Sequence, residues 1–406
     1  MALSNQVQVS IVDQSSWIPA SGQVGFIPAL NTFASVDPCP SDSCIYNQFS
    51  NGIGNEHVID AWNAVTYSPF YSTNGALVLH GGGHGDYGGN ETYVFDFDTL
   101  LFKRLDNPTT NIDRRVTDIV RTVSNMTYCE YADGQPASSH TYDNLCIIPP
   151  GKGGGAKGSL LRVVSNACGA ESAQTGYSHI FDLNNPSARW SRFSTNAFNN
   201  NAVSVHGYGC YDPLRNCVWQ WNVNGAAGLV GKLDIATKTW TMIPIANSPA
   251  PAVDSAFAQY YAARDIIVIG GANSTLTTTH FWYFDPKNIS LGAIRATKSA
   301  SIPPSSSSFV GGDICQDNGK LYVITPSGQS EDGVYEVTIP ATLSDVWNVT
   351  FRSWVGDPAA VSMLASGIDL VKWYGKRFHY CSKLKCFFFL GAGRGYTPVA
   401  FRPVGV

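Results

Sequence analysis

This chain of 406 residues has few charged side chains. Asp, Glu, Lys and Arg make up 14% of it, whereas about a quarter is usual for globular proteins. The formal net charge is −4, so the chain lacks the basic excess expected of a general nucleic-acid-binding protein. It also lacks any apolar run near the ~18–20 residues of a membrane-spanning helix, which excludes an integral membrane protein built on such helices.

Several motifs of cofactor and nucleophile sites are missing as well. The glycine-rich stretch 151–158 does not have the spacing of a phosphate-binding loop, and no nucleophile elbow occurs together with its partner residues. The chain shows no conspicuous pair of carboxylates of the kind that an ordinary glycoside hydrolase uses. We therefore expect a site that requires no cofactor and predict no metal ligands. A structural metal held with help from His80 and His84 is the weaker alternative.

The ten cysteines do not form the C-x-x-C pairs of a zinc site. Three pairs lie close together in the sequence: Cys39 and Cys44, Cys210 and Cys217, Cys381 and Cys386. The last two pairs flank predicted hairpin turns, where facing residues can reach disulfide distance. We expect disulfides, and with them an extracellular or virion-associated protein, although the first residues show no signal peptide. Reduced, buried thiols are the alternative.

Glycine, proline and aromatic residues are abundant, a composition typical of turn-rich β-proteins. One segment shows the underlying pattern best. An apolar stretch ending in glycines, Gly75–Gly83, is followed by a polar loop, by the strand-like stretch Glu91–Asp98 and by Leu101–Leu105. We predict three successive strands in this segment.

Similar units recur along the chain. Their strand-like pairs are Tyr177–Asp182 with Arg189–Phe193, Val230–Asp234 with Lys238–Ile243, Ile266–Ala272 with Phe281–Asp285, Lys320–Thr325 with Gly333–Val337, and Phe387–Gly393 with Tyr396–Phe401. Six units between residues 55 and 402 predict six four-stranded sheets that are apolar on both faces, so that neighbours must stack and close into a ring. Seven units are the alternative, because residues 107–150 are long enough to hide further strands.

The glycine-ended strand, the Tyr-x-Phe-Asp stretch Tyr93–Asp96 and a following Trp resemble the kelch repeat. The chain is similar to kelch and galactose-oxidase-type β-propellers over most of residues 55–402, most clearly in the first and fourth units. The resemblance implies an all-β fold, a single propeller of four-stranded blades. We expect residues 1–54 to supply a ring-closing strand, from Gln14–Pro19, and a cover loop, and residues 55–406 to form the propeller, all as one structural domain.

Two polar motifs fall on one rim of such a propeller. His80–Gly89 follows the second strand of the first blade, and Ser138–Asp143 stands at the start of the innermost strand of the second. Adjacent blades would bring the two motifs together. Other polar residues fall at equivalent positions in further blades: His57, His206, Asp313, His379, Arg394 and Tyr396. Five of the eight histidines thus map to this rim.

Some of these residues also have plain structural interpretations. His80 ends an apolar strand, and His179 sits inside one, so we expect both to have structural roles. The glycines before His84 suit a turn that needs positive φ, whereas His84 itself has no obvious turn role. For His140 and Tyr142, a catalytic role competes with a hydrogen-bonded hub that ties the blades together.

Histidine, tyrosine and arginine together suit β-elimination from a uronic-acid polysaccharide, because arginine neutralises the carboxylate while the others move protons. The predicted catalytic residues are His84, His140, Tyr142, Tyr208 and Arg394. The predicted substrate-binding residues are Tyr87, Asp86, His206, His379 and Tyr396. The fold and residue types are similar to those of propeller polysaccharide lyases such as the ulvan lyases, which implies a carbon–oxygen lyase with an acidic polysaccharide as its partner.

A non-catalytic propeller that binds glycans or proteins, as in adhesion or virion receptor binding, is the alternative, because fold does not fix function. We cannot place the ligand set of a galactose-oxidase copper site, so we do not expect redox chemistry. The sequence makes no prediction of the oligomeric state.

Overall fold

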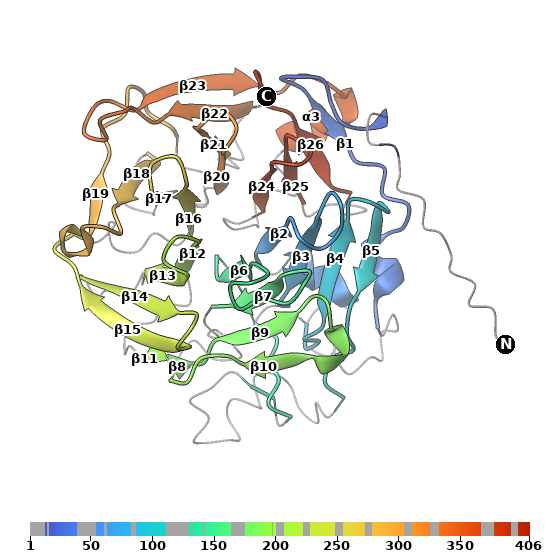
Figure 1. Ribbon diagram of the computed structural model, residues 1–406. Helices are drawn as coiled ribbons and strands as arrows, with labels where there is room; N and C mark the ends of the chain where they lie inside the picture. The colour runs from blue at the N-terminus through green and yellow to red at the C-terminus, as the bar shows by residue number, and fades with distance from the viewer. Residues whose placement is uncertain are drawn as a thin grey trace.

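Short apolar strands separated by turns form six four-stranded antiparallel sheets around a central axis (Figure 1). The chain is therefore an all-β, six-bladed β-propeller; the predicted fold and blade number are confirmed, and the alternative of seven blades is wrong. The computed structural model describes residues 13, 16–38, 54–60, 63–82, 87–110, 130–131, 133–139, 141, 143–163, 175–196, 198–199, 207–221, 228–247, 255–272, 278–303, 311–324, 333–366, 377–390 and 397–406.

Each blade is a meander that starts at the axis and runs outward. Blade 1 consists of β2 (Val65–Ser68), β3 (Ala76–His80), β4 (Thr92–Asp96) and β5 (Leu101–Arg104). Blade 2 consists of β6 (Leu145–Ile148), β7 (Ser159–Arg162), β9 (His179–Asp182) and β10 (Trp190–Arg192). Blade 3 consists of β12 (Tyr208–Asp212), β13 (Cys217–Trp221), β14 (Leu229–Asp234) and β15 (Thr239–Pro244). A separate pair joins β8 (Thr175–Gly176) to β11 (Phe198–Asn199).

The remaining blades follow the same order. Blade 4 consists of β16 (Ser255–Tyr261), β17 (Ile266–Ala272), β18 (His280–Phe284) and β19 (Ala293–Arg295). Blade 5 consists of β20 (Gly311–Cys315), β21 (Lys320–Ile324), β22 (Gly333–Thr338) and β23 (Asn348–Ser353). Blade 6 consists of β24 (Phe378–Cys381), β25 (Cys386–Phe389), β26 (Val399–Phe401) and β1 (Val24–Phe26). We call the face at which the innermost strands begin the loop face, and the opposite face, with their hairpin turns, the turn face.

The ring closes through strands from both ends of the chain. β1 pairs antiparallel with β26, with Val24 opposite Phe401 and Phe26 opposite Val399. An N-terminal closing strand was expected, but its predicted position at Gln14–Pro19 is wrong. Pro19 lacks the N–H that strand pairing needs. Trp17 is instead 6% exposed and packs in the core beside Phe97 and Phe388.

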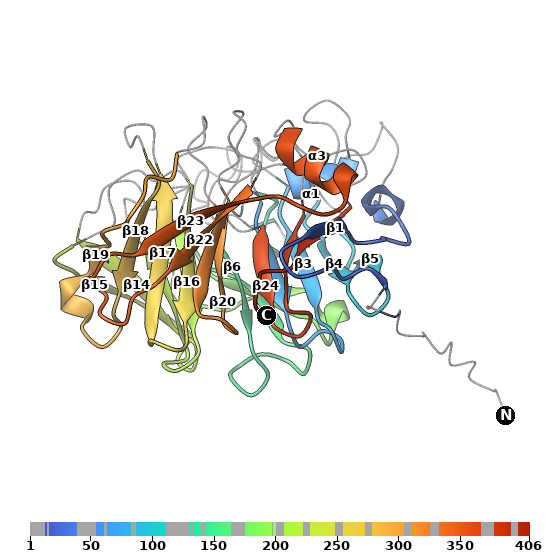
Figure 2. The same cartoon turned by 90° about the horizontal axis from the view of Figure 1, so that it is seen from above.

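Short helices lie outside the blades. α1 (His57–Asp60) and α3 (Pro358–Ser366) both lie on the loop face (Figure 2). Asp357 caps α3, since its Oδ1 accepts hydrogen bonds from the N–H groups of Ala359 and Ala360. Single turns of 3₁₀ helix occur at η2 (Phe33–Val36), η4 (Gly54–Glu56), η5 (Pro186–Ala188) and η6 (Ile289–Leu291). Among the described residues, no helix has the length and apolar character needed to span a bilayer.

In the described part of the chain the hydrophobic core forms six clusters, one between each pair of neighbouring blades. The cluster between blades 4 and 5 shows how closely they approach. The Phe257 ring lies between Gly270 and Gly312, and a Cβ atom on either glycine would come within 2.3 Å or 2.5 Å of that ring. Any larger residue at these two positions would push the blades apart.

Three of the six outermost strands, β5, β10 and β15, are protected along their free edges. The side-chain amide of Asn31 accepts a hydrogen bond from Phe102 N (2.8 Å) and donates one to Phe102 O (3.0 Å) on β5. Gln135 does the same for Trp190 on β10, and Asn196 for Trp240 on β15. Each amide takes the place of a strand residue, which blocks the edge against pairing with another chain.

The described cysteines are buried and form no disulfide, so the expected disulfides within the two hairpins are wrong. In blade 3 the register pairs Cys217 with Asp212 and Cys210 with Trp219, so the two cysteines are not opposite each other. Cys381 and Cys386 do face each other, but the Cys381 thiol donates instead to the Tyr67 hydroxyl at 2.9 Å. The pair Cys39 and Cys44 lies outside the described residues.

Removing one capping amide, as in Asn31→Ala, Gln135→Ala or Asn196→Ala, deletes two hydrogen bonds to a partly buried strand. We expect each variant to lower the free energy of unfolding by about 1–3 kcal/mol, as measured by urea denaturation. The control is Asn184→Ala, since Asn184 is exposed in the turn after β9, and it should change that free energy by less than about 0.5 kcal/mol. Equal losses in the control and the three variants would show that edge capping contributes nothing.

Candidate functional site

The described flanks of the two predicted rim motifs lie together on the loop face between blades 1 and 2, which makes this region the candidate site. Seven predicted site residues lie outside the described residues: His84, Asp86, His140, Tyr142, His206, Arg394 and Tyr396. The structure does describe Tyr87, Tyr208 and His379, together with the residues on either side of both motifs. The geometry of these neighbours defines the base of the site.

The described flanks of the two motifs are bonded directly to each other. Gly82 N donates to Ser139 O at 3.3 Å, and the Ser138 hydroxyl donates to Tyr87 O at 2.5 Å. Gly81 has φ of +131°, and a Cβ atom there would lie 2.2 Å from Asn63 Oδ1. Glycine at this position thus meets both a backbone requirement and a space requirement, as expected for the glycines of this motif.

The described residues of the second motif, Ser138, Ser139, Thr141 and Asp143, do not belong to the innermost strand, contrary to the prediction. β6 begins only at Leu145. Before that point Asp143 bonds to two other blades: its carbonyl O accepts from Gly209 N (3.2 Å), and its side-chain Oδ2 accepts from Ala258 N (3.0 Å). Asp143 therefore links blade 2 to blades 3 and 4. A hydrogen-bonded hub of this kind is the alternative to a catalytic role that the sequence analysis gives for the neighbouring His140 and Tyr142.

A buried arginine that the sequence analysis missed lies directly under both motifs. Arg162, at the end of β7, has no exposed surface. It donates to Ala137 O at 2.6 Å and to the Ser139 hydroxyl, and its Nη1 lies 3.3 Å from His80 Nε2. Burial lowers the pKa of Arg162 to about 10, so that it stays charged near neutral pH. The sequence signal for this residue is a cationic side chain within the otherwise apolar stretch Ser159–Val163.

His80 has the structural role that was expected. Its Nδ1 lies 3.3 Å from Glu91 O, which can only accept, so Nδ1 carries the proton and Nε2 accepts from Arg162. Burial, and then the charge of Arg162, lowers the pKa of His80 well below its usual range. Both ring nitrogens are engaged, and no group of three or more His, Cys, Asp or Glu residues in the described part of the chain is placed to hold a metal ion.

A second buried network lies beside the first. Glu130 accepts from His179 Nε2 at 2.8 Å and from Arg192 through Nε (3.0 Å) and Nη2 (2.5 Å). Burial opposes ionisation of Glu130, but these bonds outweigh it and lower its pKa. His179 is fully buried, so its role is structural, as expected.

Tyr87 is part of the protein interior. It has no exposed surface, and its hydroxyl donates to Glu91 Oε1 at 2.5 Å, as does the hydroxyl of Tyr93. The other oxygen of Glu91 is buried without a hydrogen-bond partner, and burial raises the pKa of this carboxyl. Asp106 nearby accepts from Thr92 N at 2.7 Å, and its second oxygen is likewise without a partner.

Tyr208 and His379 lie close to the axis. Tyr208, the first residue of β12, is 2% exposed and stacks on Trp221. Burial, and then the neighbouring Asp143, raises the pKa of Tyr208 above its usual range. His379, on β24, is 5% exposed and donates through Nε2 to Val65 O at 2.5 Å. Tyr208 packs in the hydrophobic cluster between blades 3 and 4, whereas Tyr87 packs in the cluster between blades 6 and 1.

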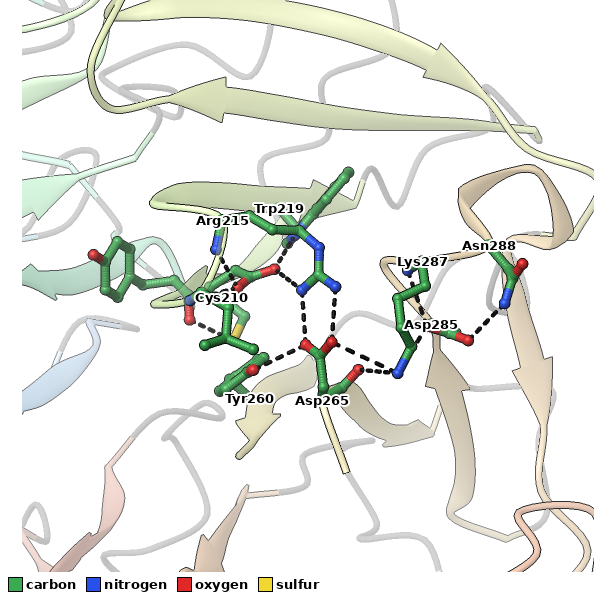
Figure 3. Close-up of polar contacts among 11 residues, drawn as sticks. Cys210, Arg215, Trp219, Tyr260, Asp265, Asp285, Lys287 and Asn288 are labelled. Atoms are coloured by element: carbon green, nitrogen blue, oxygen red, sulfur yellow. Dashed lines mark hydrogen bonds and ion pairs between the residues drawn. The ribbon is translucent and has the colours of Figure 1, made fainter. Parts of the chain in front are cut away.

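The charged cluster on the turn face is a structural link between blades 3 and 4 (Figure 3). Arg215 bonds Asp265 through Nη1 (2.7 Å) and Nη2 (2.8 Å), and Asp212 through Nη1 (2.9 Å). The Tyr260 hydroxyl also donates to Asp265, and the bonds from Arg215 lower the pKa of Asp265 to about 2. Because its carboxylates are already paired, this cluster does not resemble a catalytic centre.

Comparisons with known proteins extend to the fold alone. The sequence matches no protein-family model and no curated protein. In shape it is similar to a structural-genomics protein of unknown function from Bacteroides thetaiotaomicron VPI-5482, with a TM-score of 0.50 and 9% identity over 93% of this chain and 75% of that one. Two further likenesses are weaker. One is hydrazine synthase from Kuenenia stuttgartiensis, with a TM-score of 0.42 and 10% identity over 82% of this chain and 74% of that one. The other is a putative 6-phosphogluconolactonase from Bacteroides uniformis ATCC 8492, with a TM-score of 0.38 and 9% identity over 80% of this chain and 73% of that one.

The buried carboxyl of Asp106 should make stability depend on pH. Burial raises its pKa from 3.8 to about 7, so between these values the folded state holds a proton that the unfolded state has lost. The contribution of Asp106 to the free energy of unfolding is therefore greatest below about pH 4, and it falls as the pH rises towards 7. Asp106→Asn keeps the acceptor for Thr92 and removes the titration.

We expect Asp106→Asn to be more stable than the parent chain by roughly 2–4 kcal/mol at pH 8, with the gain shrinking towards pH 4. Urea denaturation across this pH range measures the difference. Parallel stability curves for the two proteins would contradict the proton linkage.

Proposed function

We propose that this propeller is a polysaccharide lyase that cleaves a uronic-acid-containing chain on the loop face, between blades 1 and 2. One observation carries the proposal. The described residues around the two histidine motifs bond directly to each other, through Gly82 N with Ser139 O and the Ser138 hydroxyl with Tyr87 O. Histidines 84 and 140, from separate blades, are each close in the chain to these bonds.

The reaction is a β-elimination with a complete proton balance. A base, His84 or His140, removes the C5 proton, and the electrons of that bond form a C4–C5 double bond. The C4–O4 bond breaks, and the departing O4 takes a proton from the second histidine or from a tyrosine. Arg394 pairs with the sugar carboxylate and stabilises the negative charge that develops beside C5. No electron leaves or enters, so the reaction needs no redox partner.

The charges beneath the site favour an anionic substrate. Arg162 is buried and cationic, whereas the raised pKa of Glu91 reduces the negative charge nearby. Electrostatic interactions are stronger where water is excluded, so this buried cation attracts a uronate more than an exposed one would. The chemistry of the region thus supports an acidic polysaccharide as substrate.

Among the tyrosines, Tyr208 is 2% exposed, and its raised pKa makes its hydroxyl a weaker acid than an ordinary phenol, so it is the poorer candidate for protonating O4. Tyr142 is the other candidate for this step. The same proposal includes two further points. The repeats resemble kelch blades, and an extracellular or virion location would bring such an enzyme to its polysaccharide.

The test follows the unsaturated uronate product by ultraviolet absorbance, with a panel of uronate-containing polysaccharides. We expect turnover on at least one of them, and we expect His84→Ala and His140→Ala each to lower kcat/KM by about 10²–10⁴-fold. Circular dichroism and thermal unfolding should show an intact fold in both variants. Asn184→Ala, on the turn face, is the control that should keep full activity.

Two outcomes would overturn the proposal. A folded protein that yields no unsaturated product from any member of the panel would favour the alternative of a glycan- or protein-binding propeller. Turnover that survives both histidine substitutions would place the chemistry elsewhere on the molecule.

A further inference from the structure

One position is equivalent in all six innermost strands, two residues before the end of each. It is occupied by Thr66, Cys146, Cys210, Gln259, Asp313 and His379. We call these residues the axial ring. Each is a polar or thiol residue, although the innermost strands also contain many apolar ones, such as Val65, Ile147 and Ala258. The strands that carry the ring surround the axis (Figure 1).

Three members of the axial ring bridge to the next blade through its backbone. Gln259 donates to Gly312 O at 3.4 Å, Asp313 Oδ2 accepts from Tyr380 N at 2.8 Å, and His379 donates to Val65 O at 2.5 Å. These bonds turn the side chains sideways along the ring. The middle of the axis is therefore left open rather than filled.

All six ring residues line one cavity of about 290 Å³. Pro69, Gln316 and Ser382 also line it, and each lies in the hairpin turn after an innermost strand. Gln316 and Ser382 are exposed, whereas no first residue of an innermost strand lines the described wall. The cavity thus opens on the turn face, opposite the proposed lyase site.

The described lining contains neither lysine nor arginine, so it offers no charge partner to an anion. Its carboxylate, Asp313, already accepts bonds from two backbone N–H groups, those of Ile314 and Tyr380. A cation would have to compete with these bonds. Charge therefore favours a neutral occupant.

The remaining lining groups suit a polyhydroxylated ring. The Thr66 hydroxyl makes no hydrogen bond to another described side chain or backbone group. Ser382 and Gln316 stand at the mouth, and Gln316 donates through Nε2 to Tyr260 O. Tyr211, Tyr260 and Tyr380 contribute aromatic surface. Hydroxyls and amides that both donate and accept, next to aromatic rings, match the alternating polar and apolar surface of a sugar. The volume is close to the lower limit of about 300 Å³ for small-molecule sites, which corresponds to a single sugar ring.

We propose that the axial cavity is a second carbohydrate site, which binds one neutral sugar ring from the turn face. It is independent of the proposed lyase activity, which requires an anionic sugar on the opposite face. The ring is either a free monosaccharide or the end unit of a neutral glycan.

The test titrates the full chain with D-glucose, D-galactose and D-mannose, and with D-glucuronate, followed by saturation-transfer NMR and calorimetry. We expect saturable binding of at least one neutral hexose, and binding of glucuronate that is weaker by about tenfold or more. Cellobiose and lactose distinguish a free monosaccharide from a glycan end. If the site binds the end unit of a glycan, these disaccharides should bind at least as tightly as the free hexose.

Two variants assign the binding to this cavity. Thr66→Val keeps the shape of the side chain and removes its hydroxyl, and we expect about a tenfold loss of affinity. Ser382→Trp changes an exposed turn residue, so that the fold is retained while the mouth is blocked, and binding should be lost. The matched control is Thr350→Val, an exposed residue on the outer strand β23, which should bind as the parent chain does.

Three results would overturn the proposal. They are no saturable binding of any neutral hexose at up to about 50 mM, glucuronate bound as tightly as the hexoses, or hexose binding that is unchanged in both cavity variants. The third result would place the sugar on another surface, such as the loop face.

Discussion

Each blade of this protein is apolar on both faces, and the rest of the structure depends on that constraint. A sheet of this kind needs a neighbour on each side, and a closed ring is the arrangement that provides one to all six. The six hydrophobic clusters between neighbouring blades are the result. Closure then rests on three residue pairs between β1 and β26, which join the two ends of the chain.

A ring of sheets still leaves backbone edges unpaired, and polar side chains satisfy them in two places. On the outside, the amides of Asn31, Gln135 and Asn196 each bond both polar groups of one edge residue. At the axis, Gln259, Asp313 and His379 bond the backbone of the next blade. Both arrangements let a protein with few charges meet its hydrogen-bonding requirement without filling the axis.

Two clusters of charged residues lie where blades meet. Arg162 and Glu130 are buried on the loop face between blades 1 and 2, and Arg215 and Asp265 join blades 3 and 4 on the turn face. Buried charge supports the proposal of an acidic substrate on the loop face, whereas the uncharged donors of the axial cavity support a neutral one on the turn face.

Much of the fold could be predicted from the sequence by itself, because strand periodicity and turn residues are local. The repeated units determined the all-β class and the six blades, and the position of His80 at the end of an apolar strand indicated its structural role. Tertiary structure alone decided which residues pair over long distances. It placed the closing strand at Val24–Phe26 instead of Gln14–Pro19, and it offset Cys210 from Cys217 by strand register. It also buried Tyr87 against Glu91, set Arg162 under both histidine motifs and aligned one polar residue from each blade around the axis. These features depend on contacts between residues far apart in the chain, which local sequence patterns do not encode.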